Sequence, residues 1–149
     1  SIGQYPIAFS LSRFLDSLDE KDELSKTILY NINPADNEML ATMIGNFNDG
    51  TSKGKIQWGS GWWFLDQIDG MTDQINTLSN MGMISSFIGM LTDSRSFLSF
   101  PRHEYFRRLI CNLFGNDLEK GHLPSDINWI GKIISDISYH NTKNYFDFK

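Results

Sequence analysis

The sequence has one cysteine, four prolines and no long apolar run, and these shortages exclude whole classes of protein. Cys111 has no second cysteine to pair with inside the chain, so we expect a reducing cytoplasm rather than a disulfide-stapled secreted scaffold. No stretch approaches the ~18 consecutive apolar residues of a membrane-spanning helix, which excludes a membrane partner. Residues 1–6 lack the pattern of a signal peptide and an initiator methionine, so we expect the natural start upstream.

Basic residues are also in deficit. The chain has 13 lysines and arginines and 18 aspartates and glutamates, which gives a formal net charge of −5. Binding to a nucleic-acid backbone needs clustered basic side chains, so nucleic acid is not an expected partner. With 40% hydrophobic and 21% charged residues in 149 positions, the composition is typical of one globular domain.

Apolar spacing alternates between strand-like and helix-like segments. Three short apolar runs predict strands at 27–32, 55–59 and 87–91. The last run is apolar throughout, as in a strand buried on both faces. Asn33 with Pro34, Gly82 and Pro101 are placed to begin or end helices. Helical periodicity predicts helices at 7–18, 34–47, 68–81, 101–114 and 127–137.

Alternating strands and helices are typical of parallel βαβ units in an α/β fold. Three parallel strands are few for a complete domain, because their outer edges would expose unpaired backbone groups. A closed (β/α)₈ barrel takes about 250 residues. The pattern therefore predicts either part of a TIM barrel or an unusually small open sheet.

Reactive groups in parallel α/β folds gather where the strands end. After the third expected strand, Asp93 and Arg95 stand two residues apart and would share a side if extended. A carboxylate there can ligate a divalent metal or move a proton, and an arginine can hold a substrate carboxylate. The alternative is a structural Asp–Arg pair that caps the following turn.

At the end of the second expected strand, two glycines separated by a serine precede two tryptophans. Gly59 and Gly61 let backbone approach a ligand, and Trp62 and Trp63 offer flat apolar faces that suit a sugar ring. The alternative is that both tryptophans fill the core. We predict structural roles elsewhere: surface or cap histidines (His103, His122, His140), a solvated basic helix face (Arg102, Arg107, Arg108), and packing by Cys111 and the methionines Met71, Met81, Met83 and Met90.

Several long blocks carry a resemblance to a known family. They are KTILYNINP at 26–34, GSGWWF at 59–64, GMLTDSRSFLS at 89–99 and RHEYFRR at 102–108. Together they closely resemble the C-terminal part of the uronate (glucuronate) isomerase family, a member of the amidohydrolase superfamily. The resemblance implies that residues 1–149 are the C-terminal part of a single (β/α)₈ TIM-barrel isomerase domain. They would supply its last three strands and C-terminal helices.

The resemblance also implies an activity in hexuronate catabolism. The family interconverts D-glucuronate with D-fructuronate and D-galacturonate with D-tagaturonate, an aldose–ketose isomerisation that moves a proton between C1 and C2 of the opened sugar. By resemblance, Asp93 is a metal ligand and acts in proton transfer, Arg95 contacts the substrate, and Trp62 forms part of the active-site wall. Three positions depart from the family pattern, namely Trp58, Leu65 and Phe100.

The family's HxH metal pair is missing from these residues. One aspartate would hold zinc, the expected divalent metal, poorly in comparison with three protein ligands. We therefore expect this chain alone to be inactive and to bind metal weakly or not at all. Two alternatives stay open, a non-catalytic α/β fragment and a sugar-binding module built on Trp62 and Trp63. A partial barrel with open edges is also expected to form homo-oligomers.

Overall fold

The computed structural model describes residues 5–60 and 65–147. Its strands are β1 (Thr27–Leu29) and β2 (Ile56–Trp58). The α-helices are α1 (Ala8–Asp19), α2 (Asn37–Met43), α3 (Ile68–Met81), α4 (Pro101–Glu119), α5 (Ile127–Ser135) and α6 (Asn141–Phe146). Short 3₁₀ turns are η1 (Pro34–Asp36), η2 (Ile44–Phe47), η3 (Ile84–Ser86) and η4 (Phe97–Ser99), and η5 (Asp136–His140) is a π-helical turn. None of the described helices is long and apolar enough to cross a membrane.

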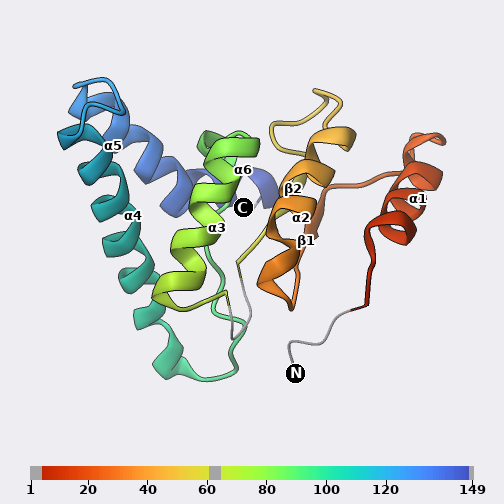
Figure 1. Cartoon of the computed structure of the whole chain (residues 1–149), viewed down its shortest axis with the longest axis horizontal. Helices are drawn as coiled ribbons and strands as arrows, with labels where there is room; N and C mark the ends of the chain where they lie inside the picture. Colours follow the sequence, from red (N-terminus) through yellow and green to blue (C-terminus); the bar gives the residue numbers. More distant parts are fainter. Residues whose placement is uncertain (1–4, 61–64, 148–149) are drawn as a thin grey trace.

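The two strands pair in parallel, with Thr27 opposite Ile56 and Leu29 opposite Trp58. A parallel bridge between Ser60 and Met90 places a third extended segment beside the end of β2. The chain is therefore an α/β protein with a parallel sheet, as the alternating pattern predicts. Figure 1 shows α1 at one end of the molecule and α4 with α5 at the other, with α3 between them.

The predicted strand at 87–91 is wrong, because within the described residues this segment keeps only the bridge at Met90. Gly89 has a φ of +78°, which breaks the extended conformation of a regular strand. The neighbouring carbonyl groups are also engaged by helix side chains. Asn141 Nδ2 donates to Phe87 O at 2.9 Å, and Thr142 Oγ1 donates to Ile88 O at 2.6 Å.

Several predicted helix ends are confirmed. Asn33 Oδ1 accepts a hydrogen bond from Ala35 N at 3.1 Å, although the first turn is the 3₁₀ turn η1 rather than α-helix. Pro101 is the first residue of α4, and Gly82 follows the last residue of α3. The helix predicted at 127–137 is longer and is divided into α5, η5 and α6.

Some predicted core residues lie at the surface instead. Cys111 is exposed, because it is one position past Ile110 on α4 and therefore turns away from the buried stripe. Met81 and Met83 are exposed, whereas Met71 and Met90 are buried as predicted. Three apolar residues of the predicted helix faces, Phe14, Ile68 and Ile127, are also exposed. Periodicity predicted these helices, but it did not show which of their apolar side chains are buried against another element.

A buried polar network joins the end of β1 to β2 and α2. The Asn31 side chain is 1% exposed, and its Nδ2 donates to Asn33 O at 2.7 Å and to Asn37 Oδ1 at 2.8 Å. Its Oδ1 accepts from Trp58 Nε1 at 2.9 Å. Gln74 of α3 donates to Trp58 O at 3.1 Å. A phenylalanine, the family's usual residue at position 58 by the resemblance, could not make the bond to Asn31.

We expect Asn31→Ala to lower the free energy of unfolding by about 2–4 kcal/mol, because Trp58 Nε1 and Asn37 Oδ1 would both lose a partner in the core. Urea unfolding of the chain measures this change. Trp58→Phe is the matched control. It leaves one buried acceptor, Asn31 Oδ1, without its partner, whereas Asn31→Ala leaves both Trp58 Nε1 and Asn37 Oδ1 unpaired, so its cost should be smaller. Equal unfolding midpoints for Asn31→Ala and the unmodified chain would contradict this interpretation.

Candidate functional site

The segments that follow the three neighbouring extended stretches lie at one edge of the sheet. Parallel pairing places the carboxyl ends of these stretches on the same side. Residues 30–33 follow β1, residues 59 and 60 follow β2, and residues 91–95 follow the bridge at Met90. This edge therefore carries the segments that contain the candidate residues predicted from the sequence.

Asp93 and Arg95 are both exposed and line one shallow hollow, together with His103 of α4. The segment is not extended at Asp93, which has a φ of +44°. Left-handed backbone is uncommon outside glycine, although aspartate tolerates it better than most residues. Asp93 and Arg95 therefore line the same hollow because a turn brings them together, not because alternate residues of a strand share one face.

Serine side chains, rather than an Asp–Arg pair, shape that turn. Ser94 Oγ accepts from Ser96 N at 3.1 Å and from Ser99 Oγ at 2.6 Å, and Ser96 Oγ accepts from Leu98 N at 3.2 Å. No ion pair joins Asp93 to Arg95, both of which lie in the described part of the chain. The alternative of a structural Asp–Arg cap is therefore wrong, and both charged groups face the hollow.

The predicted substrate-binding Trp62 and its neighbour Trp63 fall outside the described residues. Their roles stay predictions. On either side of them, Ser60 Oγ donates to Leu65 O at 2.7 Å, and both residues are fully buried. This bond fixes the two ends between which Trp62 and Trp63 stand in the sequence.

Tyr30 is a candidate that the sequence reasoning missed. Its ring lies over Gly59, where an added Cβ would stand 2.8 Å from Tyr30 Oη and would clash with the ring. Burial, and then the negative charge of Asp93, raise the pKa of Tyr30 to about 12. Tyr30 therefore remains a neutral hydrogen-bond donor near Asp93 over the ordinary pH range. Gly59 was the available signal, since a glycine after a strand permits close approach of a ring.

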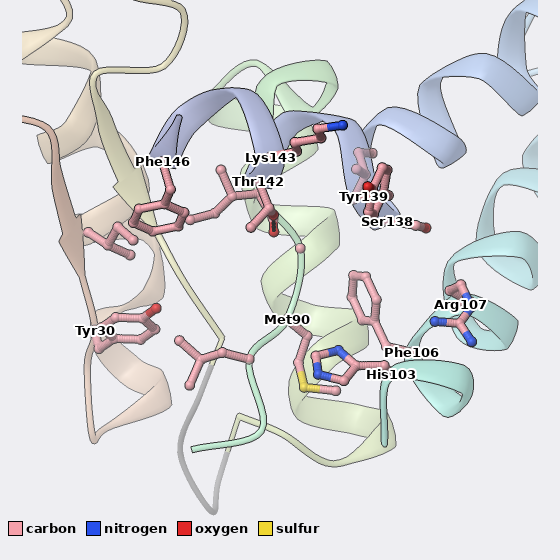
Figure 2. Close-up of a pocket in the computed structure, with 15 residues that line it drawn as sticks. Tyr30, Met90, His103, Phe106, Arg107, Ser138, Tyr139, Thr142, Lys143 and Phe146 are labelled. Atoms are coloured by element: carbon pink, nitrogen blue, oxygen red, sulfur yellow. Dashed lines mark hydrogen bonds between the residues drawn. The ribbon is translucent and has the colours of Figure 1, made fainter. Parts of the chain in front are cut away.

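A second hollow, of about 510 Å³, opens between β1, residues 88–91 and the C-terminal helices. Figure 2 shows Tyr30 and Phe146 on one side and His103, Phe106 and Arg107 on the other. His103 lines both hollows, so the two adjoin at its imidazole. The prediction of an ordinary surface histidine did not anticipate this position.

The described residues do not fit a complete metal site. They contain no group of three His, Cys, Asp or Glu side chains that could hold a metal ion. The donor set at the hollow is the carboxylate of Asp93 and the imidazole of His103. A catalytic zinc normally has three protein ligands, so this donor set is one ligand short even if both residues bind.

The three arginines of α4 differ from one another. Arg108 pairs with Glu104 at 2.8 Å on an exposed face, as predicted for a solvated side chain. Arg107 lines the hollow of about 510 Å³. Arg102 is exposed as predicted, but its Nη1 also donates to Asp66 Oδ2 at 2.9 Å and to Thr92 O at 3.1 Å, which the sequence did not indicate.

Comparison with known proteins gives consistent matches over nearly the whole chain. A family model described as glucuronate isomerase matches residues 1–146. Uronate isomerases from Flavobacterium johnsoniae and Cellvibrio japonicus are 70% and 62% identical over 148 residues, which is 99% of this chain but 32% and 31% of those proteins. The uronate isomerase of Bacteroides fragilis strain NCTC 9343 is 60% identical over 149 residues.

A crystal structure also matches. The glucuronate isomerase from Caulobacter crescentus superimposes with a TM-score of 0.78 at 23% identity, over 97% of this chain and 28% of that chain. At this identity the match shows the fold. The chain spans about a third of the length of the curated relatives it matches.

Proposed function

Because this chain belongs to the glucuronate isomerase family, we propose that it is part of an enzyme that isomerises hexuronates. The substrates are D-glucuronate, converted to D-fructuronate, and D-galacturonate, converted to D-tagaturonate. The observation that carries the proposal is the family match over residues 1–146, together with relatives 60–70% identical. We place the enzyme in the cytoplasm, in hexuronate breakdown.

The finer fold in this proposal is the C-terminal part of a (β/α)₈ barrel, with residues 1–149 as one piece of a single domain. The parallel order of β1, β2 and the Met90 bridge supports it. So does the hollow of about 510 Å³, whose lining is largely apolar. Three apolar side chains beside Arg95 are also exposed, namely Phe97, Leu98 and Phe100. The remaining strands of a barrel would cover this hollow and these exposed apolar side chains.

The chemistry of the reaction assigns roles to the candidate residues. In the opened aldose, a proton leaves C2 and returns at C1, and the bonding electrons pass through an enediol to leave a ketone at C2. The Asp93 carboxylate accepts and returns a proton during ring opening and this transfer. The Arg95 guanidinium holds the substrate carboxylate through two hydrogen bonds. Trp62 lies against the sugar face.

A divalent metal, zinc in this proposal, belongs to the assembled enzyme only. Asp93 would be one of its ligands, and the others would come from residues outside these 149. The residues described here do not complete that site, so no step of the reaction is assigned to the ion. For the 149-residue chain on its own we also propose a homo-oligomer, in which a second copy covers the sheet edges that the missing strands would otherwise cover.

A chimera tests the proposed function. Residues 1–149 replace the aligned third of the Flavobacterium johnsoniae uronate isomerase, and ketose formation from D-glucuronate is measured. We expect the chimera to turn over and the isolated 149-residue chain to give no turnover above background. A folded chimera without turnover would contradict the proposal. Calorimetric binding of D-glucuronate by the chain, without turnover in the chimera, would favour the sugar-binding module instead.

A further inference from the structure

Arg102 makes two contacts that no neighbouring arginine makes. Its Nη1 lies 2.9 Å from Asp66 Oδ2 and 3.1 Å from Thr92 O. The Asp66 side chain is 12% exposed and the Arg102 side chain is 46% exposed, so only the carboxylate side of this ion pair is shielded from water. The contacts join residues 36 and 10 positions apart, and they hold the first turn of α4 against two separate loops.

Both partners belong to segments that carry candidate residues. Thr92 O is the carbonyl of the peptide that leads directly into Asp93. Asp93 has a φ of +44°, a conformation that persists only where surrounding contacts hold it. Asp66 follows Leu65, whose carbonyl accepts the hydrogen bond from Ser60 at the end of the sheet. One guanidinium therefore ties the strained peptide before Asp93 to the segment after β2.

We propose that Arg102 is a positioning residue for the isomerase reaction: through its paired contacts with Asp66 and Thr92 O, it holds Asp93 at the orientation in which the carboxylate faces the hollow. This inference rests on the proposed function. Arg102 is absent from the described lining of both hollows, so it acts through Asp93 rather than on the substrate. Its planar, fixed array of donors suits two acceptors in different directions, which a lysine ammonium serves less well.

The chimera provides the kinetic test. Arg102→Gln removes the charge, and Asp66→Asn removes the partner. We expect each to lower kcat for D-glucuronate by about 10–100-fold, because a small displacement of a reacting group is costly. KM should change by less than about 3-fold, since Arg95 still binds the substrate carboxylate. Arg102→Lys should recover part of kcat. Arg108→Gln is the matched control, because Arg108 pairs only with the exposed Glu104 among its described ion-pair partners, and it should leave kcat unchanged.

Amide hydrogen exchange on the 149-residue chain provides a readout that is independent of turnover. Arg102→Gln should speed exchange at residues 92–96 at least about 10-fold, whereas Arg108→Gln should not. Unchanged kcat in Arg102→Gln, or faster exchange spread evenly over the chain, would overturn the inference. If the unmodified chimera had no turnover, the proposed function would fail. The exchange result would then still decide whether Arg102 holds the Asp93 segment.

Discussion

Asp93→Asn in the complete chimera is expected to lower kcat for D-glucuronate by about 10²–10⁴-fold, the usual contribution of a positioned general acid or base. Asparagine keeps the size of the side chain but can neither accept nor return the proton. The hollow that Asp93 shares with Arg95 and His103 stays the same size. Steady-state ketose formation measures the loss. Asp73→Asn, at an exposed position on α3, is the control and should leave kcat unchanged.

The same substitution has a second expected effect that needs no turnover. Burial, followed by the Asp93 charge, raises the pKa of Tyr30 to about 12. In Asp93→Asn the charge is gone but burial remains, so the pKa of Tyr30 should fall and still exceed its ordinary value. Absorbance titration of the phenolate, with Tyr30→Phe as the reference, measures this shift. A kcat close to that of the unmodified chimera would contradict the role of Asp93, and an unchanged Tyr30 pKa would contradict its position.

Arg95→Ala is expected to raise KM for D-glucuronate by about 10–100-fold, because hydrogen bonds to a charged group contribute about 1.5–3 kcal/mol. Arg95 lines the Asp93 hollow and, among the described residues, forms no ion pair that would compete for its guanidinium. Arg95→Lys keeps the charge but cannot form the bidentate pair of hydrogen bonds. Its KM should therefore lie between the KM of the unmodified chimera and that of Arg95→Ala.

The specificity of the Arg95 effect is checked with a substrate that lacks the carboxylate. D-glucose turnover in the chimera should respond little to Arg95→Ala, because D-glucose has no carboxylate for Arg95 to bind. An unchanged KM for D-glucuronate would show that another group holds the carboxylate.

The sequence predicted the elements whose formation depends on local pattern. β1, β2 and the starts of η1 and α4 follow from apolar spacing, Asn33 and Pro101. The expected third strand failed for a reason that lies far along the chain. Asn141 and Thr142 donate hydrogen bonds to the carbonyls of Phe87 and Ile88, each 54 residues earlier in the chain. Apolar spacing does not reveal these contacts.

The candidate site also contains residues that local sequence pattern predicts and residues that it does not. Asp93 and Arg95 could be selected because they follow an apolar run directly. Tyr30 was missed although Gly59 was a signal for it, and Arg102 had no signal, because the placement of both depends on partners that only the folded chain brings near. Tyr30 needs Gly59 beneath its ring, and Arg102 needs Asp66 from 36 residues away. Side chains on a polar helix face look alike in sequence until such partners are known.

The most direct measurement of the central claim mixes residues 1–149 with a Flavobacterium johnsoniae uronate isomerase that lacks the aligned third, and follows ketose formation from D-glucuronate. If the edge bearing Asp93 and Arg95 is part of a site completed by residues outside this chain, turnover should be absent from either piece and should rise to saturation as the pieces combine. Co-elution of the two pieces without turnover, or full turnover by the 149-residue chain on its own, would contradict that claim.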